Sequence, residues 1–169
     1  DSILFEVMDE EVFLMHGPAE IEDDFHLKAD SIHLQTGEEY LTALGDPVFK
    51  DGDQELYGVR MEYDLSDSEG MVFDGVTTLG SGFFSGPRMK KVGDEEINVS
   101  SAVYTTCDLP ENPHSGFYMN KVKAEGDKVY AAPVTLKIGK VPVFVVPTFF
   151  LDLKKGRRSG VLVPNFEFG

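Results

Sequence analysis

The sequence is poor in cysteine, in long apolar runs and in basic residues, and each scarcity excludes a class of protein. Cys107 is the one cysteine among 169 residues, so the chain by itself forms neither an internal disulfide nor a zinc site built from several thiolates. No stretch reaches the roughly 18–20 uncharged apolar residues that a membrane-spanning helix needs. The chain opens on Asp1 and Ser2 rather than on a methionine and a basic segment, so we expect a fragment or a processed form.

Basic residues are outnumbered two to one, and they are unevenly placed. The chain has 15 Lys and Arg against 30 Asp and Glu, which gives a net charge of −15. Residues 1–120 carry six bases and 26 acids, whereas residues 121–158 carry nine bases and three acids. Because phosphate binding needs a basic surface, the acidic body argues against nucleic acid as a partner. A plainer interpretation of the acidic charge is solubility.

Apolar and polar residues alternate through most of the chain, with turn residues between the alternating segments. The pattern predicts short strands over residues 2–8, 11–16, 19–22, 25–34, 40–44, 55–65, 70–79, 98–105, 116–124 and 128–138. Many short strands punctuated by Gly, Pro and Asp indicate an all-β sandwich, jelly roll or barrel. The glycine-rich residues 80–93 break the pattern and are predicted to form a loop, or a strand bent by glycine.

A weak internal repeat runs through the first half, with a period of about 29 residues. Leu27 aligns with Leu56, and Ile32 aligns with Met61. Each copy would be a pair of short strands that cannot bury its apolar face alone. Stacked copies would therefore share one long core or groove.

The sequence shows no convincing catalytic or metal-binding pattern. The four histidines, at positions 16, 26, 33 and 114, lack the HxH or HExxH spacing of a metal site. Cys107 and His114 could meet across the intervening loop, but a thiol and an imidazole without an orienting group are weak evidence for a nucleophile. No GxSxG sequence marks a hydrolase. We therefore predict a protein that is not an enzyme and that uses neither a cofactor nor a metal.

Two stretches resemble proteins of lipopolysaccharide transport. The repeat copy ADSIHLQTGEEYLTALGDPVF, from residue 29, is similar to the OstA/LptA-type β-domain. The segments YTTCDLPENPHSGFYMNKVK, from residue 104, and KIGKVPVFVVPTFFLDLKKGRRSGVLVPNFEFG, from residue 137, resemble the LptD family of outer-membrane lipopolysaccharide-assembly proteins. In that family they correspond to the region where the periplasmic domain leads into the barrel. The TTC, GxVPVFxxP and RRSGxLxP elements occur in the same order.

The resemblance implies a twisted antiparallel β jelly roll over residues 1–138, open at its ends, with a hydrophobic groove. It implies lipopolysaccharide transport on the periplasmic side of the outer membrane of a Gram-negative cell, with the acyl chains of lipid A in the groove. The inward residues that alternation selects are Val12, Leu14, Ile21, Leu27, Ala29, Ile32, Leu34, Leu56, Met61 and Tyr63, with Val122 and Ala124 as later candidates. The alternative is that these residues form a filled core, as alternating residues usually do.

Residues 139–169 would form a proline-containing junction to the barrel, including a strand over residues 161–168. In the family such prolines are associated with a lateral gate, and the matching positions here are Pro142, Pro147 and Pro164; from sequence alone they would only mark edge strands. Arg157 and Arg158 would lie nearest the membrane and meet lipid phosphates. Cys107 matches the family cysteine that bonds to cysteines of the barrel, and a free thiol is the alternative.

The resemblance also implies partners. The strand over residues 2–8 is expected to join the periplasmic bridge protein LptA by edge-to-edge strand addition. The LptD barrel and the lipoprotein LptE are expected in the full-length complex. Three other classes stay open from the sequence: a soluble bridge protein of LptA type, a cupin-like jelly-roll enzyme, and a structural β-repeat module that binds no lipid.

Overall fold

The fold is all-β, as expected, and it is seen in a computed structural model of the chain. The structure describes residues 4–7, 12–22, 26–35, 37–51, 54–79, 81–93, 96–108, 112–126 and 128–152. These residues contain no helix that is long and apolar enough to cross a membrane.

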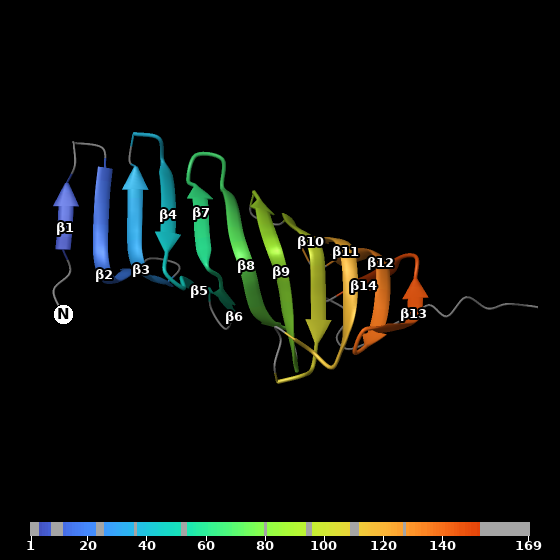
Figure 1. Ribbon diagram of the computed structural model, residues 1–169. Helices are drawn as coiled ribbons and strands as arrows, with labels where there is room; N and C mark the ends of the chain where they lie inside the picture. The colour runs from blue at the N-terminus through green and yellow to red at the C-terminus, as the bar shows by residue number, and fades with distance from the viewer. Residues whose placement is uncertain are drawn as a thin grey trace, which may run out of the picture.

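Fourteen strands in the described part of the chain make one antiparallel sheet (Figure 1). Their bounds are β1 Leu4–Val7, β2 Val12–Glu22, β3 His26–Gln35, β4 Tyr40–Leu44, β5 Val48–Asp51, β6 Gln54–Tyr57, β7 Arg60–Asp64, β8 Glu69–Leu79, β9 Gly82–Val92, β10 Glu96–Thr105, β11 Ser115–Glu125, β12 Lys128–Ile138, β13 Val141–Val146 and β14 Phe149–Asp152. The sheet runs in the order β1-β2-β3-β4-β7-β8-β9-β10-β11-β12-β13. The strands β5, β6 and β14 pair off this path. Ten of the fourteen described strand pairs join strands that are also neighbours in sequence.

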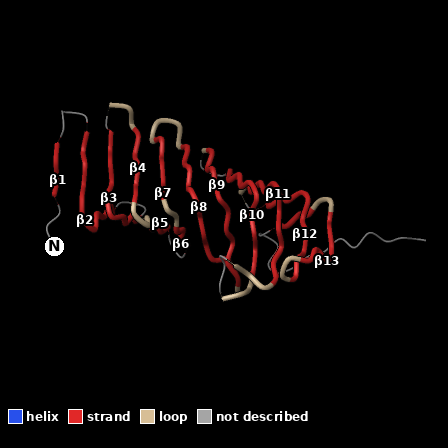
Figure 2. The backbone as a smooth tube through the Cα atoms, viewed as in Figure 1, coloured by secondary structure: helices blue, strands red, loops and turns tan. Residues whose placement is uncertain are grey.

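The sheet is folded on itself into two layers, and three of its long strands, β3, β8 and β12, change partner part of the way along. The second half of β3 pairs with β4, whereas its first half pairs with β5. In the same way β8 pairs first with β7 and then with β6, and β12 pairs first with β14 and then with β13. We call the layer with β1, β4, β7 and β14 layer A, and the layer with β5, β6 and β13 layer B. The tube in Figure 2 shows the long strands running through both.

A crease crosses the long strands between the two layers. The Cα register skips Asp74 opposite Pro87, and it skips Asn120 opposite both Ser101 and Pro133. Asp74 and Ser101 have positive φ angles of 49° and 57°. The two prolines have no N–H group to donate to a strand ladder, so they fit at positions where the ladder is interrupted.

Both halves of each long strand face one interior because the inward residues shift by one at the crease. In a straight strand, residues i and i+3 lie on opposite faces. Across the crease, inward residues are three apart. The pairs are Ala29 and Ile32, Val72 and Gly75, Gly86 and Met89, Val99 and Ala102, Met119 and Val122, and Ala131 and Val134. The extra residue in each strand acts like a β-bulge, which bends the strand and keeps its apolar side inside.

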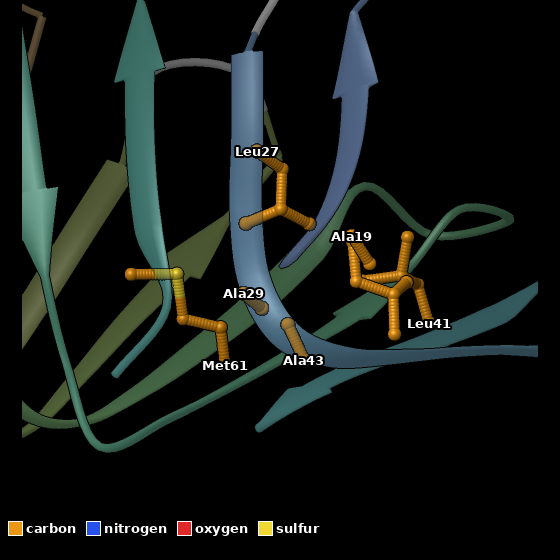
Figure 3. Close-up of a cluster of buried hydrophobic side chains, with 7 residues drawn as sticks. Ala19, Leu27, Ala29, Leu41, Ala43 and Met61 are labelled. Atoms are coloured by element: carbon orange, nitrogen blue, oxygen red, sulfur yellow. The ribbon is translucent and has the colours of Figure 1, made fainter. Parts of the chain in front are cut away.

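The interior is lined by two adjoining hydrophobic clusters. The first holds Ala19, Leu27, Ala29, Ile32, Leu41, Ala43 and Met61, which come from both layers; six of these side chains are labelled in Figure 3. The second holds Met89, Val99, Ala102, Val122, Ala131 and Val134. Leu56 and Val72 pack against both clusters, so the apolar lining is continuous along the sheet.

Small residues on the layer B side of the crease let the two layers come close together. A Cβ atom on Gly86 would lie 2.5 Å from Val99 Cγ1, and one on Gly75 would lie 2.8 Å from Met89 Sδ. Neither distance is tolerated between real atoms. Ala19, Ala29 and Ala102 occupy equivalent positions on other strands and are also buried.

The structure corrects several details of the sequence-based prediction. Of the two alternatives predicted for residues 80–93, a loop or a strand bent by glycine, the loop is wrong and the strand is right, because Gly82–Val92 make the strand β9, whose register is interrupted at Pro87. The predicted strands 11–16 and 19–22 are one strand, β2, with a register irregularity between His16 and Ala19. The predicted strand 55–65 is two strands, β6 and β7, in different layers. The strand β5 was not predicted.

The boundary predicted at residue 138 stays a prediction. Residues 141–146 and 149–152 form β13 and β14, and both pair with β12. The predicted strand over residues 161–168 lies outside the described residues.

Truncation of Ile32 tests the importance of the crease. Ile32 is fully buried, whereas Ile97 is 45% exposed on the same layer. We expect Ile32→Ala to lower the free energy of unfolding by about 2–5 kcal/mol, because a cavity is left where the layers meet. The matched variant Ile97→Ala should cost less than about 1 kcal/mol. Urea unfolding followed by circular dichroism measures both, and equal losses would contradict this account of the core.

Candidate functional site

The inward face of layer B is one row, apolar except for Thr77, that crosses ten strands. Successive members are Cα partners on neighbouring strands, so their side chains lie side by side on one face. This layer B row consists of Ile21, Leu27, Phe49, Leu56, Thr77, Phe84, Tyr104, Phe117, Leu136 and Phe144. Its second half is largely aromatic.

Layer A contributes two parallel rows. The core row lies next to the crease and consists of Ile32, Ala43, Met61, Val72, Met89, Val99, Val122, Ala131 and Phe149. The layer A row lies one step farther from the crease and consists of Leu34, Leu41, Tyr63, Gly70, Lys91, Ile97, Ala124 and Val129. Lys91 is the exception to the apolar character of these rows.

The rows differ in how well they are covered. Most of the core row is buried, with no more than 6% exposure for Ile32, Met61 and Met89. Most side chains of the two outer rows are only half-buried, although they face the interior. Exposure is highest toward the C-terminal strands, where Phe117 is 44% and Phe144 57% exposed.

The interior therefore offers apolar surface that the protein does not itself cover. Among the described residues, Ile32 and Pro47 are the largest fully buried side chains. A filled core of this many apolar residues would bury aromatic side chains such as Phe84 and Phe117. Instead they remain partly accessible, in a contiguous row. Contiguous exposed apolar surface of this kind is typical of a binding surface.

The charged residues lie mainly on the outward faces. Lys50 pairs with Glu55 at 2.6 Å, Lys90 with Glu69 at 2.7 Å, and Lys123 with Glu96 at 2.9 Å. The pKa of Glu96 is lowered by hydrogen bonds from Asn98 and Lys123. Such exposed pairs contribute little to stability. They leave the outer surface hydrated and the inner surface apolar.

Two hollows lie on the C-terminal half of the molecule. One, of about 420 Å³, is lined by residues of β10, β11, β12 and β14, among them Lys121, Lys123, Tyr130 and Phe149. The other, of about 400 Å³, includes His114, Tyr118, Lys137 and Lys140, with Lys137 Nζ 4.2 Å from the centre of the Tyr118 ring. Nowhere in the described ranges do three or more His, Cys, Asp or Glu side chains gather as metal ligands would.

Eight of the ten predicted groove residues lie together in the first cluster. Leu27, Ala29, Ile32 and Met61 are buried in it, and Ile21, Leu34, Leu56 and Tyr63 pack half-buried against it. Val12 and Leu14 belong to β2, but their side chains lie outside the described part of the structure. A role for any of these residues in lipid binding stays a prediction.

The predicted junction residues are only partly described. Pro142 lies in β13 opposite Lys137, and Pro147 follows the same strand; both are exposed. Residues 141–145 are exposed on both faces of β13, and within the described residues this strand pairs only with β12. Arg157, Arg158 and Pro164 lie outside the described residues.

The sequence analysis missed most of the C-terminal half of the interior. It selected only Val122, which is buried in the second cluster, and Ala124, which lies in the layer A row, and it did not select Phe84, Tyr104, Phe117 or Phe144. The signal is present in the sequence as the three-residue step between inward positions, such as Val99 and Ala102. The step between Ala29 and Ile32 was included in the selection, whereas the positions of the step in the later strands were found only with the crease.

Cys107 follows the end of β10 and is half-buried, with a free thiol. Its backbone N–H donates to Thr105 Oγ1 at 3.1 Å, and its Sγ donates to the Ser115 carbonyl at 3.7 Å. Hydrogen bonding by Thr105, and then by the Ser115 main chain, lowers the pKa of the Cys107 thiol to about 7. No hydrogen bond between Sγ and the His114 ring is found among the described contacts. Pairing of Cys107 with a cysteine of a barrel stays a prediction.

Comparison with known proteins confirms the resemblance to the LptD family. The chain is 28% identical over 151 residues to the LPS-assembly protein LptD of Photobacterium profundum. The aligned region covers 85% of the chain and 19% of that protein. The chain is 25% identical over 146 residues to LptD of Nitrosomonas eutropha and 27% identical over 160 residues to LptD of Burkholderia cenocepacia, covering 83% and 89% of the chain and 20% of each relative. The chain thus spans about a fifth of the length of the curated relatives it matches, consistent with an N-terminal domain of LptD. No family model matches the chain.

The Cys107 thiol should react at a lower pH than an ordinary cysteine. Its pKa of about 7 is below the usual value, so the thiolate form and the alkylation rate should rise as pH increases through 7. Thr105→Val removes the hydroxyl and should move the midpoint of the iodoacetamide rate profile upward. Thr105→Ser keeps the hydroxyl and should leave it in place. A midpoint near 8.5 in the unaltered protein would contradict this geometry.

Proposed function

We propose that this chain is a lipid-conducting domain of LptD type, which binds lipopolysaccharide during its assembly at the outer membrane. The acyl chains of lipid A would lie on the inward apolar rows, and the sugars would stay in water. The observation that carries the proposal is the layer B row, because its aromatic side chains face inward and yet stay half-exposed. The relatives' name, LPS-assembly protein LptD, supports this choice of ligand.

The energetics favour an acyl-chain ligand. Each methylene group transferred from water to an apolar surface contributes about 0.8 kcal/mol, so a few chains supply enough binding energy without charged contacts. The net charge of −15 does not oppose this mode of binding, because among the described residues the acidic side chains that form ion pairs, such as Glu69 and Glu96, lie on outward faces. The electrostatic cost of an anionic glycolipid is then limited by solvent screening.

The proposed path runs from the N-terminal strands toward the C-terminal strands. The layer B row is continuous along the sheet, and its exposure increases toward β11 and β13. Lipid would enter from the periplasmic bridge protein LptA at the β1 end and leave toward the LptD barrel and its lipoprotein LptE beyond β13. The exposed strand β13, with Pro142 in it and Pro147 after it, supports an exit at this end.

Edge strands provide the means of joining these partners. Among the described residues β1 pairs only with β2, which leaves its other edge able to accept a strand from the bridge protein. If a strand of the bridge protein pairs with β1, the two sheets become one, and the apolar interiors of the two proteins form one continuous surface. The domain would then sit on the periplasmic side of the outer membrane.

Adjacent aromatic residues on opposite faces allow a sharp test of lipid binding. Phe84 and Phe117 face the interior, whereas their neighbours Phe83 and Tyr118 face outward. A benzophenone amino acid placed at each position in turn, in cells, should crosslink to lipopolysaccharide only at Phe84 and Phe117. Buried positions such as Ile32 are unsuitable for the probe, because substitution there disturbs the core.

Crosslinks at all four positions would indicate nonspecific contact with membranes. Crosslinks at none of them, in a protein that folds, would show that the interior holds no lipid and would leave a structural β-repeat module. Either result would overturn the proposed function.

Proline substitutions in β1 test the joining strand. Phe5→Pro should abolish copurification with the bridge protein and leave the fold intact, because proline cannot donate to an added strand. Successive N–H groups point to opposite sides of a strand, so Phe5→Pro and Glu6→Pro remove donors from opposite edges of β1, and the variant that loses a donor to β2 should have the lower melting temperature. Binding that persists in both variants would place the joining edge elsewhere.

A further inference from the structure

Lys91 is a charged side chain on the inward face of the molecule. It lies two residues after Met89, which is buried in the second cluster, so both side chains point to the same face. In the layer A row its Cα partners are Gly70 and Ile97. Lys91 Nζ lies 5.5 Å from the centre of the Tyr63 ring, which packs against the first cluster.

Glycine at position 70 brings these two side chains together. A Cβ atom on Gly70 would lie 3.0 Å from Tyr63 Cδ2 and 3.6 Å from Lys91 Cβ. Tyr63 and Lys91 therefore lean over Gly70 from the strands on either side of it. The result is a cation and an aromatic ring side by side, near the outer limit of the inward surface of layer A.

Among the described residues, no acidic side chain lies beside Lys91 on that face. The three inward rows contain no other charged residue among those the structure describes. Glu69 and Glu96, which are adjacent in sequence to the Cα partners of Lys91, face outward and pair with Lys90 and Lys123. No carboxylate of the described residues lies within ion-pair distance of Lys91 Nζ.

The ammonium group of a lysine in this position is stabilised by contact with water or with an anion. An ammonium group beside an apolar surface is unfavourable unless it reaches water or an anion, and the long stem of lysine lets it reach the rim. The same arrangement suits an amphiphile whose apolar chains lie on the inward rows and whose anionic group lies at the rim. A phosphate group is a strong partner, because it accepts charge-assisted hydrogen bonds.

We propose that Lys91, positioned by Tyr63, binds a phosphate on the headgroup of the lipid and selects phosphorylated lipids for the interior. This inference rests on the proposed function and deepens it, because it names the residue that reads the headgroup. It also fixes the orientation of the lipid, with its phosphate on the layer A side and its chains toward layer B.

Removal of the Lys91 charge tests the proposal. Lys91→Met removes the charge and keeps an unbranched side chain, and Lys91→Arg keeps the charge. The adjacent Lys90→Met changes the same charge on the opposite face and serves as the matched control. Binding of lipid A and of enzymatically dephosphorylated lipid A is titrated in the full-length protein in detergent, with a benzophenone at Phe84 as the reporter.

We expect Lys91→Met to weaken binding of phosphorylated lipid A roughly tenfold, as the loss of one charge-assisted hydrogen bond would, and to leave the dephosphorylated form unaffected. Lys91→Arg and Lys90→Met should bind both lipids as the unaltered protein does. Equal binding of both lipids by Lys91→Met and the unaltered protein would overturn the proposal. So would an equal loss for both lipids, because it would indicate a role in packing.

A second measurement separates a lipid headgroup from free phosphate. Acylation of Lys91 by an N-hydroxysuccinimide ester should be slowed by phosphorylated lipid A and not by inorganic phosphate. Protection by inorganic phosphate alone would indicate a simple anion site and overturn the proposal. If the unaltered protein binds neither lipid, the proposed function itself fails. If it binds both without discrimination, only the assignment of Lys91 fails.

Discussion

The three-residue step between inward side chains at the crease is the constraint on which the rest of the structure depends. Without it, the second half of every long strand would present its polar face to the first half. With it, Ala29 and Ile32 line the same interior, and so do Val99 and Ala102. Because the step recurs from β3 to β12, a single sheet of mostly sequential hairpins becomes two facing layers without any long crossover.

The crease also determines how much of the interior the protein can fill. Small residues beside it, such as Gly75 and Gly86, bring the layers close enough for Met89 and Val99 to be buried. Away from the crease the layers are not held together by such contacts, and side chains such as Phe84 and Phe117 stay partly exposed. Stability and apolar binding surface are thus placed at different distances from the same line. A mutation can weaken one with little effect on the other.

The sequence predicts the fold class and most of the N-terminal interior, because period-two alternation is a local signal. Leu27, Ala29, Ile32 and Leu34 were selected correctly as inward, including the step between Ala29 and Ile32. Gly58 and Val59 separate β6 from β7 through backbone hydrogen bonds to Pro47 and Phe73, and these are long-range contacts that alternation cannot reveal. Glycines around Phe83 and Phe84 left a loop and a glycine-bent strand equally open, and in the fold they serve close packing within the strand β9. The rows themselves depend on cross-strand register, which is a property of the assembled sheet.

The position of Lys91 bears on whether the interior is a core or a binding surface. A core has no use for a charged side chain, and exchange to an apolar residue would cost it little. A binding surface for an amphiphile needs one polar contact at its rim to orient the ligand, and apolar surface elsewhere. The sequence Met89-Lys90-Lys91 places one lysine in an outward ion pair with Glu69 and the other against Tyr63 on the apolar side. The two lysines are alike in sequence, and only the face on which each lies separates a solvated surface charge from a group positioned to read a ligand.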